Sequence, residues 1–101
     1  MSLHDDLVAA KALIADPVAW AQGGDVDAEK GRRCAAVACN DFQAARSMYA
    51  ALHAELPASW RTKRAPFRVS DIFDFNDDPA TTHADVIALF DRAIASAESS
   101  S

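Results

Sequence analysis

One segment near the end of the chain has apolar residues at helical spacing, and this pattern constrains the fold most. Between residues 82 and 97, one face is formed by Val86, Ile87, Phe90, Ala93, Ile94 and Ala97. Such spacing predicts a helix with one buried face, so the rest of the chain must supply a surface that covers it. Thr81 or Thr82 is expected to cap this helix, and Thr82 with Asp85 resembles a capping box.

A short aromatic and acidic segment precedes that helix. It begins with Ile72, Phe73, Asp74 and Phe75. The next four residues, Asn76-Asp77-Asp78-Pro79, predict a turn, because Asn and Asp side chains bond nearby backbone groups and proline cannot continue a helix. The apolar part is expected to plug into the core, either as a brief strand or as one short helical turn capped by Ser70.

Two chemical interpretations compete with simple turn formation in this region. The first is a cation site, because Asp74, Asn76, Asp78 and Asp85 follow the order of ligands in an EF-hand loop. The sequence departs from that motif where Pro79 replaces glycine and where an aspartate replaces the bidentate glutamate. The turn-and-cap interpretation therefore remains beside the cation site.

The second chemical interpretation is an acid–base pair. His83 stands near Asp77, Asp78 and Asp85 in the sequence, and a histidine beside a carboxylate is a common general base. A histidine in the first turn of a helix is, however, commonly just exposed. No motif for a nucleophile, a phosphate loop or a catalytic zinc accompanies it.

Upstream of residue 70, helical segments alternate with irregular ones. Helices are predicted at Leu3–Asp16 and Asp41–Leu56, and Ala35–Cys39 is either a separate helix or the start of one long helix. Pro17, the paired glycines at 23 and 24, and Pro57 interrupt the helical pattern. We therefore predict an all-α, single-domain bundle of three to four helices over residues 1–97, with irregular connecting segments at 17–30 and 57–70. A disordered tail is expected at 98–101.

Several side chains have predicted places in an Ala-rich core. The first helix should bury a stripe of Leu3, Leu7, Ala10 and Ile14, widened by Val8 and Leu13. Trp20 is expected to be a core anchor whose indole N–H reaches a carbonyl, or else a ligand-stacking residue. His53 follows Leu52 and should lie at the edge of the core.

Charge is distributed unevenly along the chain. The formal net charge is −5, which disfavours general nucleic-acid binding. Residues 71–101 contain seven acidic residues and one basic residue, whereas residues 60–69 contain four basic residues and none that is acidic. In the basic stretch, Trp60, Arg61 and Arg64 suit either a solvated loop with buried aromatics or a patch for an acidic partner or nucleic acid.

Cysteine usage and hydropathy limit the compartment and the cofactors. Cys34 and Cys39 are too few for a disulfide framework and lack the spacing of a zinc site, so reduced, buried thiols and no metal or other cofactor are expected. No apolar run approaches the roughly 20 residues of a membrane span. We expect a cytoplasmic protein without membrane association.

Several short motifs along the chain resemble, as a set, those of one protein family. Trp20-Ala21-Gln22-Gly23 is a Trp-x-Gln-Gly turn, and residues 34–38 follow a Cys-x-x-Gly-Ala pattern with Val37 in place of glycine. Asn76-Asp77, Thr82 and a helix that closes with Asp-Arg-Ala-Ile at 91–94 complete the set. Together they resemble DUF6197, a family of bacterial and phage domains, over most of residues 7–94.

The resemblance implies a compact, mostly helical domain and no established reaction. It also points to four residues that could form either a shared site or an architectural latch: Trp20, Gln22, Asn76 and Asp77.

We therefore expect a small, acidic, non-enzymatic protein-interaction module. In its sharpest form it is a phage-related inhibitor of a host or defence complex, similar to an anti-CRISPR protein, whose acidic surface competes for a basic channel. The alternative is a small ligand- or cation-binding protein that uses the turn between Asp74 and Asp85, and a homodimer would follow from an exposed apolar helix face. The interaction candidates are Asp74, Asn76, Asp77, Asp78, Asp85, Trp20, Gln22, Trp60, Arg61 and Arg64.

Overall fold

The first helix of the computed structural model, which describes residues 2–61 and 68–99, is α1 at Leu3–Ile14. The Ser2 hydroxyl accepts a hydrogen bond from the Asp5 backbone N–H at 3.1 Å and so caps the helix. Leu7, Ala10 and Ile14 are buried, as predicted. Val8 and Leu13 are 44% and 38% exposed, so the prediction that they widen the buried stripe is wrong.

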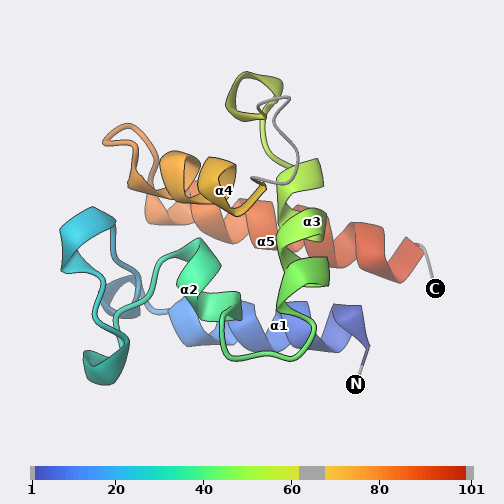
Figure 1. The fold of residues 1–101 in the computed structure, drawn as a ribbon, viewed down its shortest axis with the longest axis horizontal. Helices are drawn as coiled ribbons and strands as arrows, with labels where there is room; N and C mark the ends of the chain where they lie inside the picture. Colours follow the sequence, from blue (N-terminus) through green and yellow to red (C-terminus); the bar gives the residue numbers. More distant parts are fainter. Residues whose placement is uncertain (1, 62–67, 100–101) are drawn as a thin grey trace.

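Residues 15–34 connect α1 to the next α-helix without an α-helix of their own, and we call this segment the excursion. Three short 3-10 helices, Pro17–Ala19, Gly23–Asp25 and Ala28–Lys30, lie along this excursion. Gly31 has φ 74°, a conformation that glycine adopts without steric cost. The two limbs are joined by backbone hydrogen bonds, from Ala21 N–H to the Arg33 carbonyl at 3.0 Å and from Arg33 N–H to the Ala19 carbonyl at 2.9 Å. The excursion therefore starts and ends at the same place in the fold (Figure 1).

The sequence allowed either one long helix or two separate helices after residue 34, and the structure has two. Helix α2 spans Ala35–Cys39 and α3 spans Ala45–Ala54, so residues 40–44 interrupt the helical path. The Tyr49 hydroxyl donates to the Asn40 side-chain carbonyl at 3.0 Å and bridges that interruption. Met48 and Leu52 of α3 are fully buried, as the apolar spacing predicts.

The last two helices are α4 at Arg68–Asp77 and α5 at His83–Ser99. The predicted short plug and the turn from Asn76 are wrong in extent, because α4 continues as a ten-residue helix through Asp77. The turn occupies the residues after it, where the Thr81 N–H bonds the Asp78 carbonyl at 2.9 Å. Helix α5 also runs two residues into the predicted tail.

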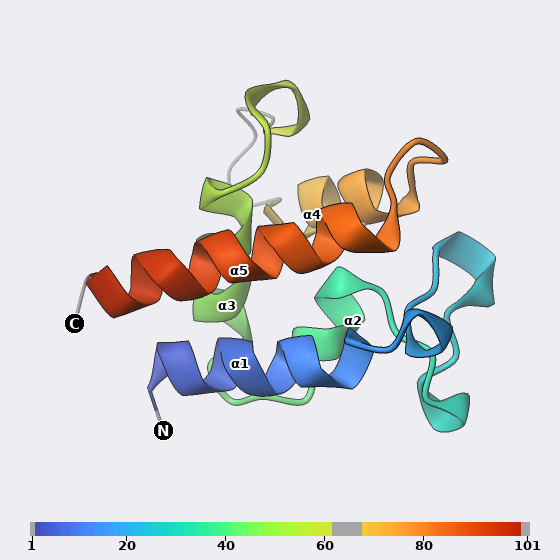
Figure 2. The same ribbon diagram turned by 180° about the vertical axis from the view of Figure 1, so that it is seen from behind.

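The helices form an all-α domain in which α1 and α5 run antiparallel and α3 crosses them (Figures 1 and 2). The described residues contain no β-strand, only two isolated bridges. Within the same residues no helix is both long and apolar enough to span a bilayer. Four of the five helices are ten residues or longer, so the predicted three-to-four-helix bundle is confirmed with one additional short helix, α2.

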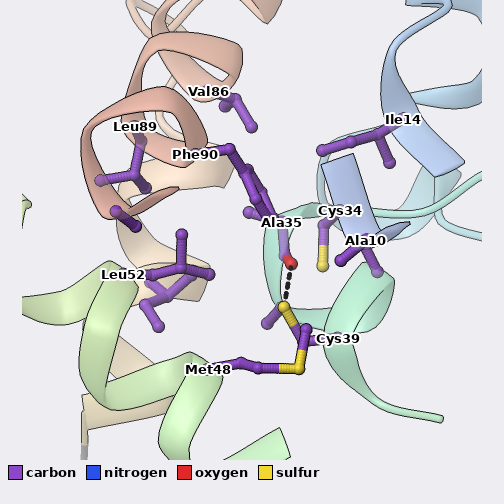
Figure 3. Packing of buried hydrophobic residues seen from close by; sticks show 14 of the residues in the cluster. Ala10, Ile14, Cys34, Ala35, Cys39, Met48, Leu52, Val86, Leu89 and Phe90 are labelled. Atoms are coloured by element: carbon purple, nitrogen blue, oxygen red, sulfur yellow. Dashed lines mark hydrogen bonds between the residues drawn. The ribbon is translucent and has the colours of Figure 1, made fainter. Parts of the chain in front are cut away.

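The core lies where α1, α2, α3 and α5 meet (Figure 3). Phe90 of α5 is the largest fully buried side chain. The space around it is filled by residues that include Ala10, Ile14, Cys34, Ala35, Leu52, Val86 and Leu89. Small side chains from α1 and α2 let α1 approach both α5 and α2 closely, which confirms the predicted Ala-rich core.

Candidate functional site: a polar latch and an acidic surface

A fully buried asparagine at the end of α4 connects three distant segments. The Asn76 side-chain oxygen accepts from the Trp20 indole N–H at 2.7 Å and from the Ala35 backbone N–H at 3.0 Å. Its amide nitrogen donates to the Ala21 carbonyl at 3.0 Å and to the Asp77 carboxylate at 3.0 Å. These four bonds use both acceptor and both donor positions of the amide, so none of its polar capacity is left for a ligand.

Two further side chains extend this network to the turn between α4 and α5. The Gln22 amide nitrogen donates to the carbonyls of Asn76 and Asp78 at 2.9 Å each and to the Thr81 carbonyl at 3.3 Å. The Asn76 carbonyl is in the last turn of α4, where carbonyls have no partner within the helix, and the other two lie in the α4–α5 turn. The Asp77 carboxylate accepts from the Gly23 backbone N–H at 2.8 Å.

We call Trp20, Gln22, Asn76 and Asp77 the latch. The four residues that the family resemblance singled out therefore come together, and the indole of Trp20 finds a carbonyl, as predicted. Their contacts join the 15–34 excursion to the end of α4. The arrangement is that of an architectural latch.

His83 attaches α5 to the same end of α1. Its Nε2 lies 2.7 Å from the Ile14 carbonyl, which can only accept, so this nitrogen carries a hydrogen. The His83 ring lies 5.8 Å from the Trp20 ring, tilted by 56°. Of the two interpretations of His83, neither full exposure nor a hydrogen bond to Asp77, Asp78 or Asp85 is seen among the described residues; the partner of its Nε2 is a backbone carbonyl.

The residues of the EF-hand-like pattern do not converge on one point. Asp74 and Asn76 are two positions apart on α4, so Asp74 is exposed while Asn76 is buried. Asp78 accepts from the Ala80 N–H at 2.8 Å, and Asp85 accepts from the Thr82 N–H at 2.9 Å. No group of three metal-ligating side chains occurs in residues 2–61 and 68–99, so the proposed cation site is not formed there.

The bond to Asp85 belongs to a complete capping box. The Thr82 hydroxyl accepts from the Asp85 N–H at 3.1 Å while the Asp85 carboxylate accepts from the Thr82 N–H. This confirms the cap that the sequence predicts for α5.

Four carboxylates nevertheless gather around the α4–α5 turn and form what we call the acidic surface: Asp74, Asp77, Asp78 and Asp85. None of them forms an ion pair with another described residue. A hollow of about 350 Å³ adjoins Asp78 and Asp85 and is also lined by Trp60, Phe75 and Arg92. Aromatic surface and carboxylates therefore occur side by side.

The basic stretch is only partly described. Trp60 is half-buried, with its ring 5.9 Å from that of Phe75 in an edge-on arrangement, so it packs against α4. The Arg61 guanidinium donates to the Ala54 carbonyl at 3.4 Å, at the end of α3. Arg64 lies outside the described residues.

One pair of titratable groups was missed by the sequence argument. His53 of α3 and Asp71 of α4 lie 2.7 Å apart, and their side chains are 15% and 4% exposed. His53 is at the edge of the core, as predicted. The sequence indicates that each residue lies at the edge of the core, because each is next to a core residue of its helix. It does not indicate that these two residues meet, because that depends on how α3 and α4 pack.

Both cysteines are buried thiols without nucleophilic character. Burial raises the pKa of Cys34, and it raises that of Cys39 to about 12. The Cys39 thiol also donates to the Ala35 carbonyl at 3.6 Å (Figure 3). Because the thiolate is the reactive form, burial and the raised pKa disfavour both cysteines as nucleophiles near neutral pH.

Comparison with known proteins gives a family and nothing closer. No curated protein and no solved structure matches the chain. The model of a family of unknown function, DUF6197, matches residues 1–96 and so includes α1 to α4, most of α5 and the whole latch. The chain belongs to the DUF6197 family.

Proposed function

We propose that this chain is a non-enzymatic protein-interaction module that binds a basic surface of a partner through its acidic surface. The proposal rests on what the reactive side chains do in the fold and on what remains exposed.

The side chains best suited to catalysis have structural partners. His83 bonds the Ile14 carbonyl, and His53 bonds Asp71. The two cysteines are fully buried. These bonds engage one ring nitrogen of each histidine in holding helices together, and both thiols are enclosed by the core. This supports binding over catalysis.

The observation that carries the proposal is that the carboxylates of the acidic surface form no ion pair within residues 2–61 and 68–99. Two other acids of the same region have cationic or titratable partners: Asp91 lies 2.7 Å from the Lys11 ammonium, and Asp71 is bonded to His53. The four carboxylates of the acidic surface have no such partner among the described residues. They therefore retain the field that attracts a basic surface and orients it during encounter.

The hollow beside Asp78 and Asp85 provides a concave place in the acidic surface that a partner side chain can enter. Trp60 and Phe75 line it together with Arg92, so an arginine or lysine that enters on the Asp78 and Asp85 side would meet aromatic rings and two carboxylates beside one cation of this chain. A partner that normally holds nucleic acid in a basic channel offers such side chains. More specifically, the proposed module inhibits a host or defence complex, as an anti-CRISPR protein does. Its carboxylates would take the place of nucleic-acid phosphates in the basic channel. It would act in the cytoplasm, which suits its two free thiols.

The test uses affinity capture of the tagged chain from host lysate at moderate salt, read by mass spectrometry. The variant carries Asp74→Asn, Asp78→Asn and Asp85→Asn, which remove three charges while Asn side chains can still accept the turn and cap hydrogen bonds. Asp77 is left intact because it holds Gly23. We expect the wild-type chain to capture one stoichiometric partner and the variant to lose it.

A matched control removes the same number of charges elsewhere, at the exposed residues Asp25, Glu29 and Asp41, by Asp→Asn and Glu→Gln changes. This control should capture the partner as the wild type does. Equal capture by the acidic-surface variant would refute the proposal, as would the absence of any protein partner.

A further inference from the structure

The end of the molecule farthest from the latch contains a second, larger hollow. It has a volume of about 550 Å³ and lies where the start of α1, the end of α3 and the end of α5 come together. Figures 1 and 2 show the start of α1 and the end of α5 on the same side of the molecule, with α3 crossing nearby. We call this hollow the end groove.

Small apolar side chains and acidic ones line the end groove. Its residues are Ser2, Leu3, His4, Ala51, Ala54, Glu55, Ala93, Ser96, Ala97 and Glu98. Four alanines from α3 and α5 cannot fill the space between the helices, and this leaves room for a side chain from outside. The lining contains two carboxylates and no lysine or arginine.

Each carboxylate at the rim has a polar neighbour. The Ser96 hydroxyl donates to the Glu55 carboxylate at 3.1 Å. Glu98 lies 3.6 Å from the His4 Nε2 and has further contacts. An occupant that suits both floor and rim has an apolar stem and a cationic head, as lysine and arginine do.

The backbone around the end groove favours a helical occupant. The last carbonyls of α3 already have partners, because Arg61 donates to the Ala54 carbonyl and Arg92 donates to the Glu55 carbonyl at 3.1 Å. An extended peptide gains its affinity from main-chain hydrogen bonds along a strand edge, which residues 2–61 and 68–99 do not provide. A helix satisfies its own backbone and needs only side-chain contacts.

From this geometry we infer that the end groove is a second docking site, and that it takes a basic amphipathic helix of a partner protein. The helix lays its apolar face on the alanine floor and places lysine or arginine against Glu55 and Glu98. This surface is separate from the acidic surface at the α4–α5 turn.

The test uses a synthetic helical peptide of leucine and lysine at amphipathic spacing, added to the isotope-labelled full chain. Amide chemical shifts should move most at Ala51, Ala54, Ser96 and Ala97. A peptide with glutamate in place of lysine should leave them unchanged. A variant with Glu55→Gln and Glu98→Gln should bind the lysine peptide roughly tenfold more weakly, since two charge contacts are lost.

Two further variants separate the end groove from the rest of the molecule. Ala51→Leu with Ala97→Leu fills the floor and should abolish the shifts, while the thermal transition shows that the variant is folded. The charge-matched control Asp25→Asn with Glu29→Gln should bind the peptide as the wild type does. The variant Asp74→Asn, Asp78→Asn and Asp85→Asn should also keep the end-groove shifts, so the two proposals can fail independently.

Several outcomes would overturn the inference. These are shifts confined to the acidic surface, equal binding of the lysine and glutamate peptides, or unchanged binding after the floor is filled. Sedimentation that shows a dimer whose contacts cover the end groove would also overturn it, by making a second copy of the chain the occupant.

Discussion

At one end of the α1–α5 pair, where α1 finishes and α5 begins, hydrogen bonds between distant segments close the structure, whereas at the other end alanines leave an open groove. The latch end brings together Trp20, Gln22, Asn76 and His83, whose partners are far away in the sequence. The groove end contains Ala51, Ala54 and Ala97, with carboxylates at the rim. The same pair of helices is therefore fixed by polar contacts at one end and left accessible at the other.

The difference separates stability from recognition within one small domain. A buried polar network is costly when one member is missing, because each orphaned donor or acceptor loses its water without gaining a partner. Alanines on a half-exposed surface carry no such penalty. We therefore expect substitutions at the latch end to act on folding and substitutions at the groove end to act on binding.

The largest effect should come from Asn76→Ala. It leaves the Trp20 indole N–H, the Ala35 N–H and the Ala21 carbonyl without their partners. At about 1–3 kcal/mol for each orphaned group, the free energy of unfolding should fall by roughly 4 kcal/mol or more. Urea unfolding measures the change. Asp74→Ala, an exposed position on the same helix, serves as control and should stay within about 0.5 kcal/mol.

A smaller loss is expected for Gln22→Ala, which removes one hydrogen bond from each of the carbonyls of Asn76, Asp78 and Thr81, while the Asp78 carbonyl keeps the Thr81 N–H. Because these groups can reach water once the side chain is gone, we expect a loss of roughly 1–2 kcal/mol. Hydrogen exchange should become faster at the α4–α5 turn and stay unchanged at the core of α3. Exchange that accelerates equally everywhere would contradict a local role for Gln22.

The sequence predicts the parts of this fold that depend on periodic burial. Helices α1, α3 and α5 follow apolar residues spaced three and four apart, and the cap at Ser2 and the capping box at Thr82 depend on neighbours along the chain. The sequence did not predict the full length of α4, because Asn76 and Asp77 favour turns when their side chains bond the nearby backbone. In the fold those side chains are used by Trp20, Ala21, Ala35 and Gly23 instead, so the helix continues past them.

The sequence identified the residues of the latch, but it did not identify their hydrogen-bond partners. The motifs shared with the family singled out the four latch residues, but bonds such as Gln22 to Thr81 span 59 residues and arise from packing. The EF-hand order failed because a helix turns Asp74 and Asn76 to different sides. The His53–Asp71 pair depends on which helix edges meet, and local pattern does not record that.

At the groove end, a substitution that would be harmful in the core should be nearly neutral. Ala54 is exposed at the end of α3, so Ala54→Leu should change the free energy of unfolding by no more than about 0.5 kcal/mol. Thermal or urea unfolding checks this. The contrast is Ala10→Leu, because Ala10 is fully buried outside the end groove and the added atoms should overpack the core by about 1–3 kcal/mol. Equal losses for the two variants would remove the distinction between floor and core.

The smallest effect concerns acid at the groove end. Hydrogen bonds from His4 and then Ser2 lower the pKa of Asp5 below its usual value of 3.8. A carboxyl whose pKa is depressed by folding stabilises the fold above pH 3.8 and loses this contribution as the pH falls through the folded-state pKa. An NMR titration of the Asp5 carboxyl should therefore show a midpoint below 3.8, and His4→Ala should move that midpoint upward. Because Asp5 is exposed, the effect on unfolding should be slight, and a marked acid transition that disappears in Asp5→Asn would show that the groove end also holds the fold together.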